Sequence, residues 1–180
     1  MTRLSRIKRL PFLLLDAGPI IKLFELGIWE QFIKTCDVTI TRTVAEIEVV
    51  FASKGNDKEY IDLMPYEEQG QIKIVDVEPS TVKTFYDEFD PLYKDIIDPG
   101  ENETLAFMHT SSEKWLVCAA DHAVFRVLGF LGKSEHGISL EEVLKNVGLS
   151  RQLEWQYTKR FRERWTRIGQ VDSLQDGGTP

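Results

Sequence analysis

Four acidic residues stand where a predicted strand or turn leads into a helix. Asp16, Glu46 and Asp121 come after short apolar runs that are predicted to be strands, and Glu103 lies in the first turn of a predicted helix. The carboxyl ends of parallel strands meet in the crevice where open α/β sheets bind their ligands. Carboxylates gathered there repel one another and favour a divalent cation, and oxygen-only ligation suits Mg²⁺ or Mn²⁺. The pattern therefore predicts metal-dependent phosphodiester chemistry.

The second of these positions has two candidates, because Glu48 follows Glu46 in the same predicted helix. A carboxylate at the edge of a buried helix face should be followed by apolar residues about one, four and five positions later. These positions hold Ile47, Val50 and Phe51 after Glu46, and Val49, Ala52 and Ser53 after Glu48. The apolar match is better for Glu46, which is therefore the favoured candidate.

The helix start also offers two acids. Glu103 is placed to project inward from the first turn, whereas Glu101 is expected to favour the helix N-terminus electrostatically or to orient a metal-bound water. Each acid taken alone has a structural explanation, since Asp16 and Asp121 could each cap the helix that follows. The repetition of an acid at four such junctions favours a shared site over four unrelated caps.

Strands and helices alternate along the chain and would position these acids. Strands are predicted at residues 12–15, 38–40, 72–77 and 115–120, with helices between them. This alternation predicts an α/β fold, a three-layer α/β/α sandwich with a central parallel sheet and extra C-terminal helices. A short helix is also predicted within residues 56–70, with Tyr60, Leu63 and Met64 facing inward.

Composition limits the class of protein. With 180 residues and 42% apolar content the chain can bury one core, and its apolar runs are shorter than the roughly 20 residues of a membrane helix. Cys36 and Cys118 lack the spacing of a metal or redox motif, so they are expected to be buried reduced thiols in a cytoplasmic protein. No membrane partner is expected.

Positive charge concentrates at the two ends of the chain. Residues 1–9 carry four basic residues and no acid, and residues 151–168 carry six basic residues against two acids. Basic ends could contact nucleic-acid phosphates, but they are also typical of ordinary solvated helix faces. The last predicted helix, at residues 150–168, interleaves its arginines with Trp155, Tyr157, Phe161 and Trp165. Such aromatics could stack on unpaired bases, although packing on the core or on a second subunit is favoured.

The motifs around the four acids, in this order and spacing, resemble those of the PIN domain. This nuclease fold is found in VapC-type toxins and in stand-alone ribonucleases. The motifs are Leu14-Leu15-Asp16-Ala17-Gly18-Pro19-Ile20-Ile21, Thr43-Val44-Ala45-Glu46-Ile47, Gly100-Glu101-Asn102-Glu103-Thr104-Leu105-Ala106 and Ala119-Ala120-Asp121. The third is similar to the Gly-Glu-x-Glu variant of one PIN branch. Two departures are Ala119 and Ala120 in place of a hydroxyl residue and a second motif shifted by one residue.

The resemblance implies a ribonuclease that hydrolyses RNA phosphodiester bonds. One or two Mg²⁺ or Mn²⁺ ions would be held by Asp16, Glu103 and Asp121, with Glu46 completing the acidic pocket. It implies a PIN-like nuclease domain at residues 1–135. The residues beyond have no counterpart in the family and are predicted from their own pattern to form a C-terminal helical extension at 136–168 and a disordered tail at 169–180. An antitoxin protein is an expected partner if the chain is the toxin of a toxin–antitoxin pair, and a homodimer is a further expectation.

Two other functions compete with this one. A catalytically inactive PIN-like module could bind RNA or a protein partner. A receiver-like or phosphatase-like domain also gathers acids at strand ends, but a receiver needs a phosphate-sensing lysine after its last strand. Here that strand is followed by His122 and Arg126. His122 itself is expected to point away from the crevice and to pack or lie at the surface.

Overall fold

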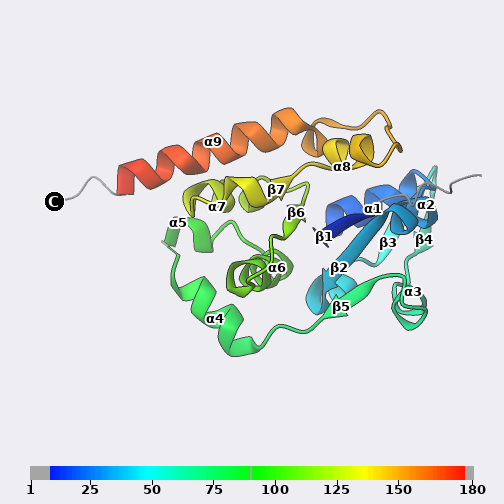
Figure 1. Ribbon diagram of the computed structural model, residues 1–180, viewed down its shortest axis with the longest axis horizontal. Helices are drawn as coiled ribbons and strands as arrows, with labels where there is room; N and C mark the ends of the chain where they lie inside the picture. The colour runs from blue at the N-terminus through cyan, green and yellow to red at the C-terminus, as the bar shows by residue number, and fades with distance from the viewer. Residues whose placement is uncertain (1–8, 90, 177–180) are drawn as a thin grey trace, which may run out of the picture.

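The computed structural model describes residues 9–89 and 91–176, which form a five-stranded parallel sheet with helices on both faces (Figure 1). The strand order is β5–β2–β1–β6–β7. The strands are β1 (Leu10–Leu15), β2 (Cys36–Thr41), β5 (Lys73–Val75), β6 (Leu116–Cys118) and β7 (Gly137–Ile138). The predicted fold class is confirmed, and four of these strands fall where the apolar runs predicted them.

The central strand β1 shows why the sheet needs cover on both sides. Leu13 and Leu15 belong to one hydrophobic cluster and Leu14 to another, and none of the three is exposed. Successive side chains of a strand point to opposite faces, so this apolar run requires two layers of helices. One layer contains α1 (Ala17–Glu25), α2 (Trp29–Thr35) and α8 (Leu140–Asn146). The other contains α4 (Pro79–Asp87), α5 (Pro91–Lys94), α6 (Pro99–Thr110) and α7 (His122–Phe130).

The segment after β2 differs from the prediction. Instead of an α-helix, Val44–Glu48 forms a single π-helical turn, closed by a hydrogen bond of 3.0 Å from the Val49 amide to the Val44 carbonyl. The expected buried face is wrong, because the side chains of Ile47 and Phe51 are 69% and 50% exposed. A π turn bonds residues five apart, so positions derived from the α-helical repeat fall on the wrong side.

A β-hairpin follows this turn and was not predicted. Strands β3 (Phe51–Lys54) and β4 (Asp57–Tyr60) pair antiparallel, and the short helix α3 (Met64–Glu68) comes after them. The predicted short helix is therefore present only at residues 64–68. Leu63 is buried as predicted, but Tyr60 is 67% exposed and stacks edge to face on Phe51 across the hairpin.

The C-terminal residues fold onto the same body. Strand β7 adds an edge to the sheet, and the long helix α9 (Lys159–Asp176) runs beside α7 (Figure 1). Residues 169–176 are helical, so the predicted disorder is wrong for them. Residues 177–180, like the basic residues 1–8, lie outside the described part of the chain. The last aromatics pack inward as favoured, since Tyr157 and Phe161 are buried, whereas Trp155 is half-exposed.

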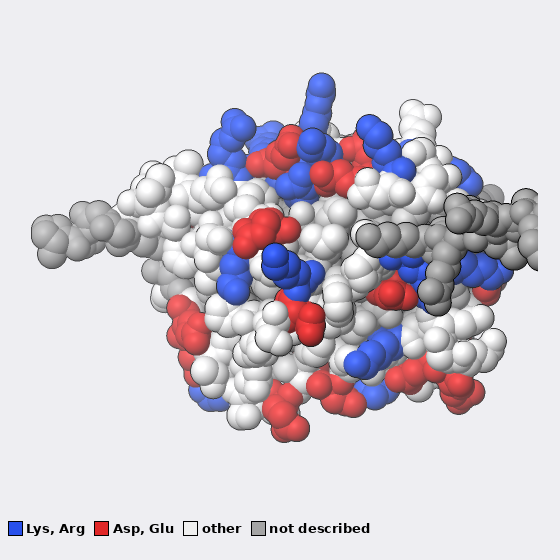
Figure 2. All heavy atoms as spheres, in the orientation of Figure 1, with Lys and Arg blue, Asp and Glu red and all other residues white. Residues whose placement is uncertain are grey.

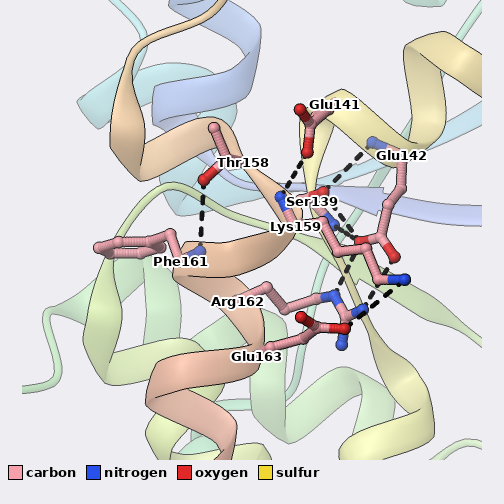
Figure 3. A network of polar contacts seen from close by, with 8 residues as sticks. All are labelled: Ser139, Glu141, Glu142, Thr158, Lys159, Phe161, Arg162 and Glu163. Carbon is pink, nitrogen blue, oxygen red and sulfur yellow. Dashed lines mark hydrogen bonds and ion pairs between the residues drawn. The ribbon is translucent and has the colours of Figure 1, made fainter.

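Polar contacts join α8 to the start of α9 (Figure 3). Arg162 donates two hydrogen bonds to Glu142, of 2.7 and 2.8 Å, and the Lys159 amide donates to Glu141 at 2.7 Å. Glu142 also completes a capping box with Ser139 at the start of α8. Because one carboxylate caps α8 and pairs with α9, the two helices keep a fixed relation.

Helices α7 and α9 approach closely because each has a glycine at the contact. A Cβ atom placed on Gly129 would overlap the Thr166 carbonyl, and one on Gly169 would overlap the Arg126 carbonyl. The contact is reinforced by an ion pair of 2.7 Å between Arg126 and Asp172. Small residues are therefore required at this crossing.

We expect Gly169→Ala to lower the free energy of unfolding by about 2 kcal/mol, because α9 must move away from α7 to admit a methyl group. Chemical denaturation followed by circular dichroism would measure the change. Arg167→Ala, at an exposed position of the same helix, is the matched control and should change stability by less than about 0.5 kcal/mol. Equal stability of the two variants would contradict the close contact.

Both cysteines are buried and free, as predicted. Among the described residues, no helix has the length and apolar character needed to cross a membrane.

Candidate acidic site

The carboxyl ends of β1 and β6 bring two of the predicted acids to the same edge of the sheet. Asp16 follows β1 directly, and its amide donates a hydrogen bond of 3.0 Å to the Cys118 carbonyl at the end of β6. The turns that follow touch each other, because a Cβ atom on Gly18 would stand 2.9 Å from the Cβ of Ala120. A larger residue at position 18 would push the β1 turn away from the turn that carries Asp121.

Asp16 has no structural partner that accounts for its charge. It occupies the N-cap position of α1 but makes no side-chain capping hydrogen bond. Asp16 is 6% exposed, and its Oδ1 is buried without a hydrogen-bond partner among the described residues. Burial, opposed by a hydrogen bond from the Ala17 amide and assisted by the charges of Asp98, Glu48 and Asp121, raises the pKa of Asp16 to about 7. A buried unpaired carboxylate is costly and needs a cation, a proton or a ligand.

Asp121, in contrast, does cap a helix. Its Oδ1 accepts a hydrogen bond of 2.8 Å from the Ala123 amide and lies 3.0 Å from the His122 ring nitrogen Nδ1. Its side chain is half-exposed at the edge of the crevice. The His122 ring packs 4.7 Å from that of Trp165, so the predicted packing role of His122 is confirmed.

The N-terminus of α6 carries a reciprocal pair of carboxylates. Asp98 accepts a hydrogen bond of 2.8 Å from the Glu101 amide, and Glu101 accepts one of 3.1 Å from the Asp98 amide. Burial raises the pKa of Glu101 to about 9, with the charges of Asp16, Asp121 and Asp98 adding to the effect. Glu101 therefore acts at the helix N-terminus through hydrogen bonds, and because its carboxyl keeps a proton at neutral pH it does not supply the predicted negative charge there.

Glu103 anchors α6 to the end of β2. It is 7% exposed, and its Oε2 accepts a hydrogen bond of 2.8 Å from the Thr43 amide. Next to it, the hydroxyl oxygens of Thr104 and Thr41 lie 3.1 Å apart inside the core. The side chain of Glu103 thus faces β2, on the same side of α6 as the segment that carries Glu48.

Glu48 lies beside these acids, whereas Glu46, the candidate favoured from the sequence, does not. Glu46 forms an exposed ion pair of 2.8 Å with Arg42, which also pairs with Asp76. Glu48 instead accepts a hydrogen bond of 2.9 Å from the Gly100 amide. The physical reason is the π-helical turn, which rotates Glu48 rather than Glu46 toward α6.

The raised pKa of Glu48 reflects its position beside Asp98 and Glu103. The pKa of Glu48 is raised to about 7, chiefly by burial. The charge of Asp98, a hydrogen bond with the Asp98 carboxyl and the charge of Glu103 contribute to the same increase. Position 100 must be glycine for this contact, since a Cβ atom there would overlap the Glu48 carboxylate. Glu48 therefore connects the turn after β2 to the N-terminus of α6.

The site contains carboxylates that sequence reasoning missed. Asp98 influences Asp16, Glu48 and Glu101 and so lies between the two parts of the cluster. A signal for it exists in the sequence, because Asp98-Pro99-Gly100-Glu101 has a capping acid, a proline at the first helical position and a glutamate at the third. The cluster consists of Asp16, Glu48, Asp98, Glu101, Glu103 and Asp121.

Carboxylate oxygens suit a hard cation, but the number of them that the protein places around one point is limited. Within residues 9–89 and 91–176, no three acidic, histidine or cysteine side chains are arranged to hold one ion together. Mg²⁺ is commonly bound through only one or two carboxylates, with waters and substrate phosphates completing its shell. The unpaired Oδ1 of Asp16 fits that mode of binding. An ion held here would depend on its substrate for part of its coordination.

Comparison of the chain with protein-family models, with curated proteins and with solved structures found no match.

Proposed function

We propose that this protein is a metal-dependent ribonuclease of the PIN type, which hydrolyses RNA phosphodiester bonds at the acidic cluster. The observation that carries the proposal is Asp16, a buried carboxylate with an unpaired oxygen at the carboxyl end of a parallel sheet. Its charge interacts with those of Asp98, Glu48, Asp121 and Glu101, and a cation together with a phosphate would relieve their mutual repulsion.

The chain's own residues have separable roles in this proposal. Asp16 and Asp121 would hold Mg²⁺ or Mn²⁺, while Glu48 and Glu103 form the wall of the site on the side of β2. The ion supplies activation of a water and stabilisation of charge on the phosphoryl oxygens. Glu101 carries a proton at neutral pH, because of its raised pKa, and holds it beside Asp16. No side-chain nucleophile is needed.

The edge formed by α9 offers positive charge to an RNA backbone. Lys159, Arg160, Arg164 and Arg167 are exposed on this helix, and Figure 2 shows lysine and arginine side chains along that edge with acidic side chains among them. Contacts of this kind are independent of sequence and weaken with salt. In this proposal RNA is the substrate, and the protein acts in the cytoplasm as a stand-alone enzyme or as a toxin held by an antitoxin. A homodimer belongs to the same proposal.

A catalytically inactive module that binds RNA or protein is the alternative. It is favoured by one observation, the lack of three metal-ligating side chains placed around one point in the described residues. The two functions differ in whether RNA is cut when a divalent ion is present.

The test is incubation of mixed RNAs with the protein in Mn²⁺, in Mg²⁺ and in EDTA. Cleavage is expected in the metal lanes alone, and Glu48→Gln should reduce its rate by about 10- to 100-fold. Glu46→Gln is the matched control, two residues away with its carboxylate on Arg42, and should stay within about threefold of the wild type. Intact RNA in every lane would reject the enzyme, and equal losses in both variants would reject the assignment of Glu48.

A further inference from the structure

A cavity of about 510 Å³ lies between α4 and the N-terminal turns of α6. Asp98 and Glu103 belong to its lining, so it opens onto the acidic cluster. Its volume is in the range of sites that accommodate small organic ligands. Whatever occupies this cavity would lie beside the phosphate that the acids are proposed to cleave.

Asn102 contributes an unsatisfied amide to the cavity. The residue is 8% exposed, and its Oδ1 is buried with no hydrogen-bond partner among the described residues. A buried amide without partners costs free energy, and most such groups in native proteins are paired. Asn102 belongs to the cavity lining, so a rotation of its side chain would turn this amide toward a ligand there.

Part of the cavity lining is apolar and contains one aromatic ring, while Thr43, Lys83, Asp98 and Glu103 add polar groups. Val77, Val82 and Ile97 line the cavity together with Tyr86. The Tyr86 hydroxyl donates a hydrogen bond of 3.1 Å to the Lys94 carbonyl, which fixes the orientation of the ring. Apolar and aromatic walls with a single amide match a planar heterocycle that has hydrogen-bonding groups along its edge.

We propose that this cavity is a subsite for one unpaired nucleobase of the RNA, next to the bond that is cleaved. The inference rests on the proposed function and adds the determinant of base preference. The side chain of Asn102 pairs with the edge of the base, and Tyr86 with its apolar neighbours contacts the face. Cleavage therefore depends on which base stands at one position beside the scissile phosphate.

The chemistry of Asn102 provides a diagnostic substitution. An amide offers both donors and an acceptor, whereas an ionised carboxylate only accepts. Asn102→Asp, assayed at alkaline pH so that its carboxyl is ionised, should therefore shift the preferred base toward guanine, whose Watson–Crick edge presents adjacent donors, by about tenfold relative to the wild type. Asn102→Leu, with a similar shape and no polar group, should remove the preference.

The first experiment digests a library of unpaired RNA of random sequence in Mn²⁺ and sequences the cleavage ends. A base preference at one position that Asn102→Asp changes supports the subsite. Cleavage by the wild type without such a preference, or a preference that Asn102→Asp and Asn102→Leu leave unchanged, overturns it while the ribonuclease remains.

A second pair of variants leaves Asn102 and the acids intact. Val82→Trp should fill the cavity from α4 and reduce the base preference at least about fivefold. Thr84→Trp, exposed on the same helix and outside the cavity lining, is the control and should keep the preference. Circular dichroism would confirm that each variant is folded, and equal behaviour of the two tryptophan variants overturns the proposal.

Binding separates failure of the subsite from failure of the function. The four uncharged ribonucleosides are titrated into the wild type in EDTA, and the side-chain amide signals of Asn102 are followed by NMR. Selective shifts that Val82→Trp abolishes support the subsite even if no RNA is cut in the first experiment. No shift with any nucleoside, together with no base preference in cleavage, overturns it.

Discussion

Replacing Asp16 with asparagine is expected to abolish RNA cleavage and, at the same time, to stabilise the metal-free protein at pH 8. The two effects have one cause. Burial raises the pKa of Asp16 to about 7, so at pH 8 the side chain is largely ionised although its Oδ1 has no partner. Asparagine keeps the shape and removes the charge. The unfolding free energy should rise by about 1 kcal/mol or more, because a buried unpaired charge costs more than a buried unpaired amide.

The loss of activity should be at least about 100-fold, since Asp16 is the residue proposed to bind the ion directly. Rates of RNA cleavage in Mn²⁺ and denaturation curves in EDTA would be measured on the same preparation. Asp57→Asn, on the exposed tip of the hairpin, is the control and should change neither quantity. An inactive but more stable variant separates loss of chemistry from loss of folding. A destabilised variant, or one with normal activity, would contradict the role of Asp16.

The parts of the fold that were predicted depend on local patterns. The runs around Leu14 and Val117 are continuous and apolar because those strands are covered on both faces, and this signal identifies buried strands without any tertiary information. Strand β7 escaped prediction because it has two residues, one of them a glycine. So short a strand is formed by its neighbour β6 and not by its own propensity.

Two errors came from applying a regular period where tertiary contacts decide. The polar segment at residues 169–176 lacks an apolar stripe, yet it is helical because Gly169 seats it against α7 and Asp172 pairs with Arg126. Similarly, an α-helix was predicted at residues 44–48, where the structure has a π turn. The π turn is held by the Glu48 contact with Gly100, which is distant in sequence.

In the candidate site, too, the residues set by local sequence patterns were predicted and those set by tertiary contacts were not. Asp16 and Asp121 lie at the ends of adjacent strands, which the sequence pattern anticipates. Asp98 and Asn102 were not anticipated. Asp98 precedes a helix and has the appearance of an ordinary cap, and the unpaired state of Asn102 exists only once α4 is packed beside α6. Unsatisfied buried groups can be recognised from coordinates alone.

The metal-free protein is expected to lose stability as the pH rises from 5 to 9, and Mg²⁺ is expected to restore it. Burial raises the pKa of Asp16 and of Glu48 to about 7 and that of Glu101 to about 9, from ordinary values of 3.8 for Asp and 4.5 for Glu. Between the unfolded and folded pKa values, the native state binds protons that the unfolded state has released. The free energy of unfolding therefore falls with increasing pH in this window. The contribution is fully present below about pH 4, and it is lost through about pH 7 and, for Glu101, through about pH 9.

Other carboxylates act in the opposite direction, but outside this window. Ion pairs with Arg42 and Arg126 lower the pKa of Asp76 and of Asp172, so these acids contribute stability above their unfolded values and lose it only at lower pH. Above pH 5 they are ionised in both states and do not affect the slope. The acidic cluster is therefore expected to dominate the pH dependence from 5 to 9.

Thermal unfolding followed by circular dichroism, in EDTA and in Mg²⁺, would measure the effect. In EDTA the melting temperature should fall by at least about 5 °C between pH 5 and pH 8, as a loss of about 2 kcal/mol produces in a domain of this size. Mg²⁺ should raise it more at pH 8 than at pH 5, because the ion takes the place of protons that are still bound at the lower pH. The double variant Asp16→Asn, Glu48→Gln should flatten both dependences. A melting temperature that increases from pH 5 to pH 8 in EDTA, or a Mg²⁺ effect independent of pH, would show that these carboxylates do not form one charged site.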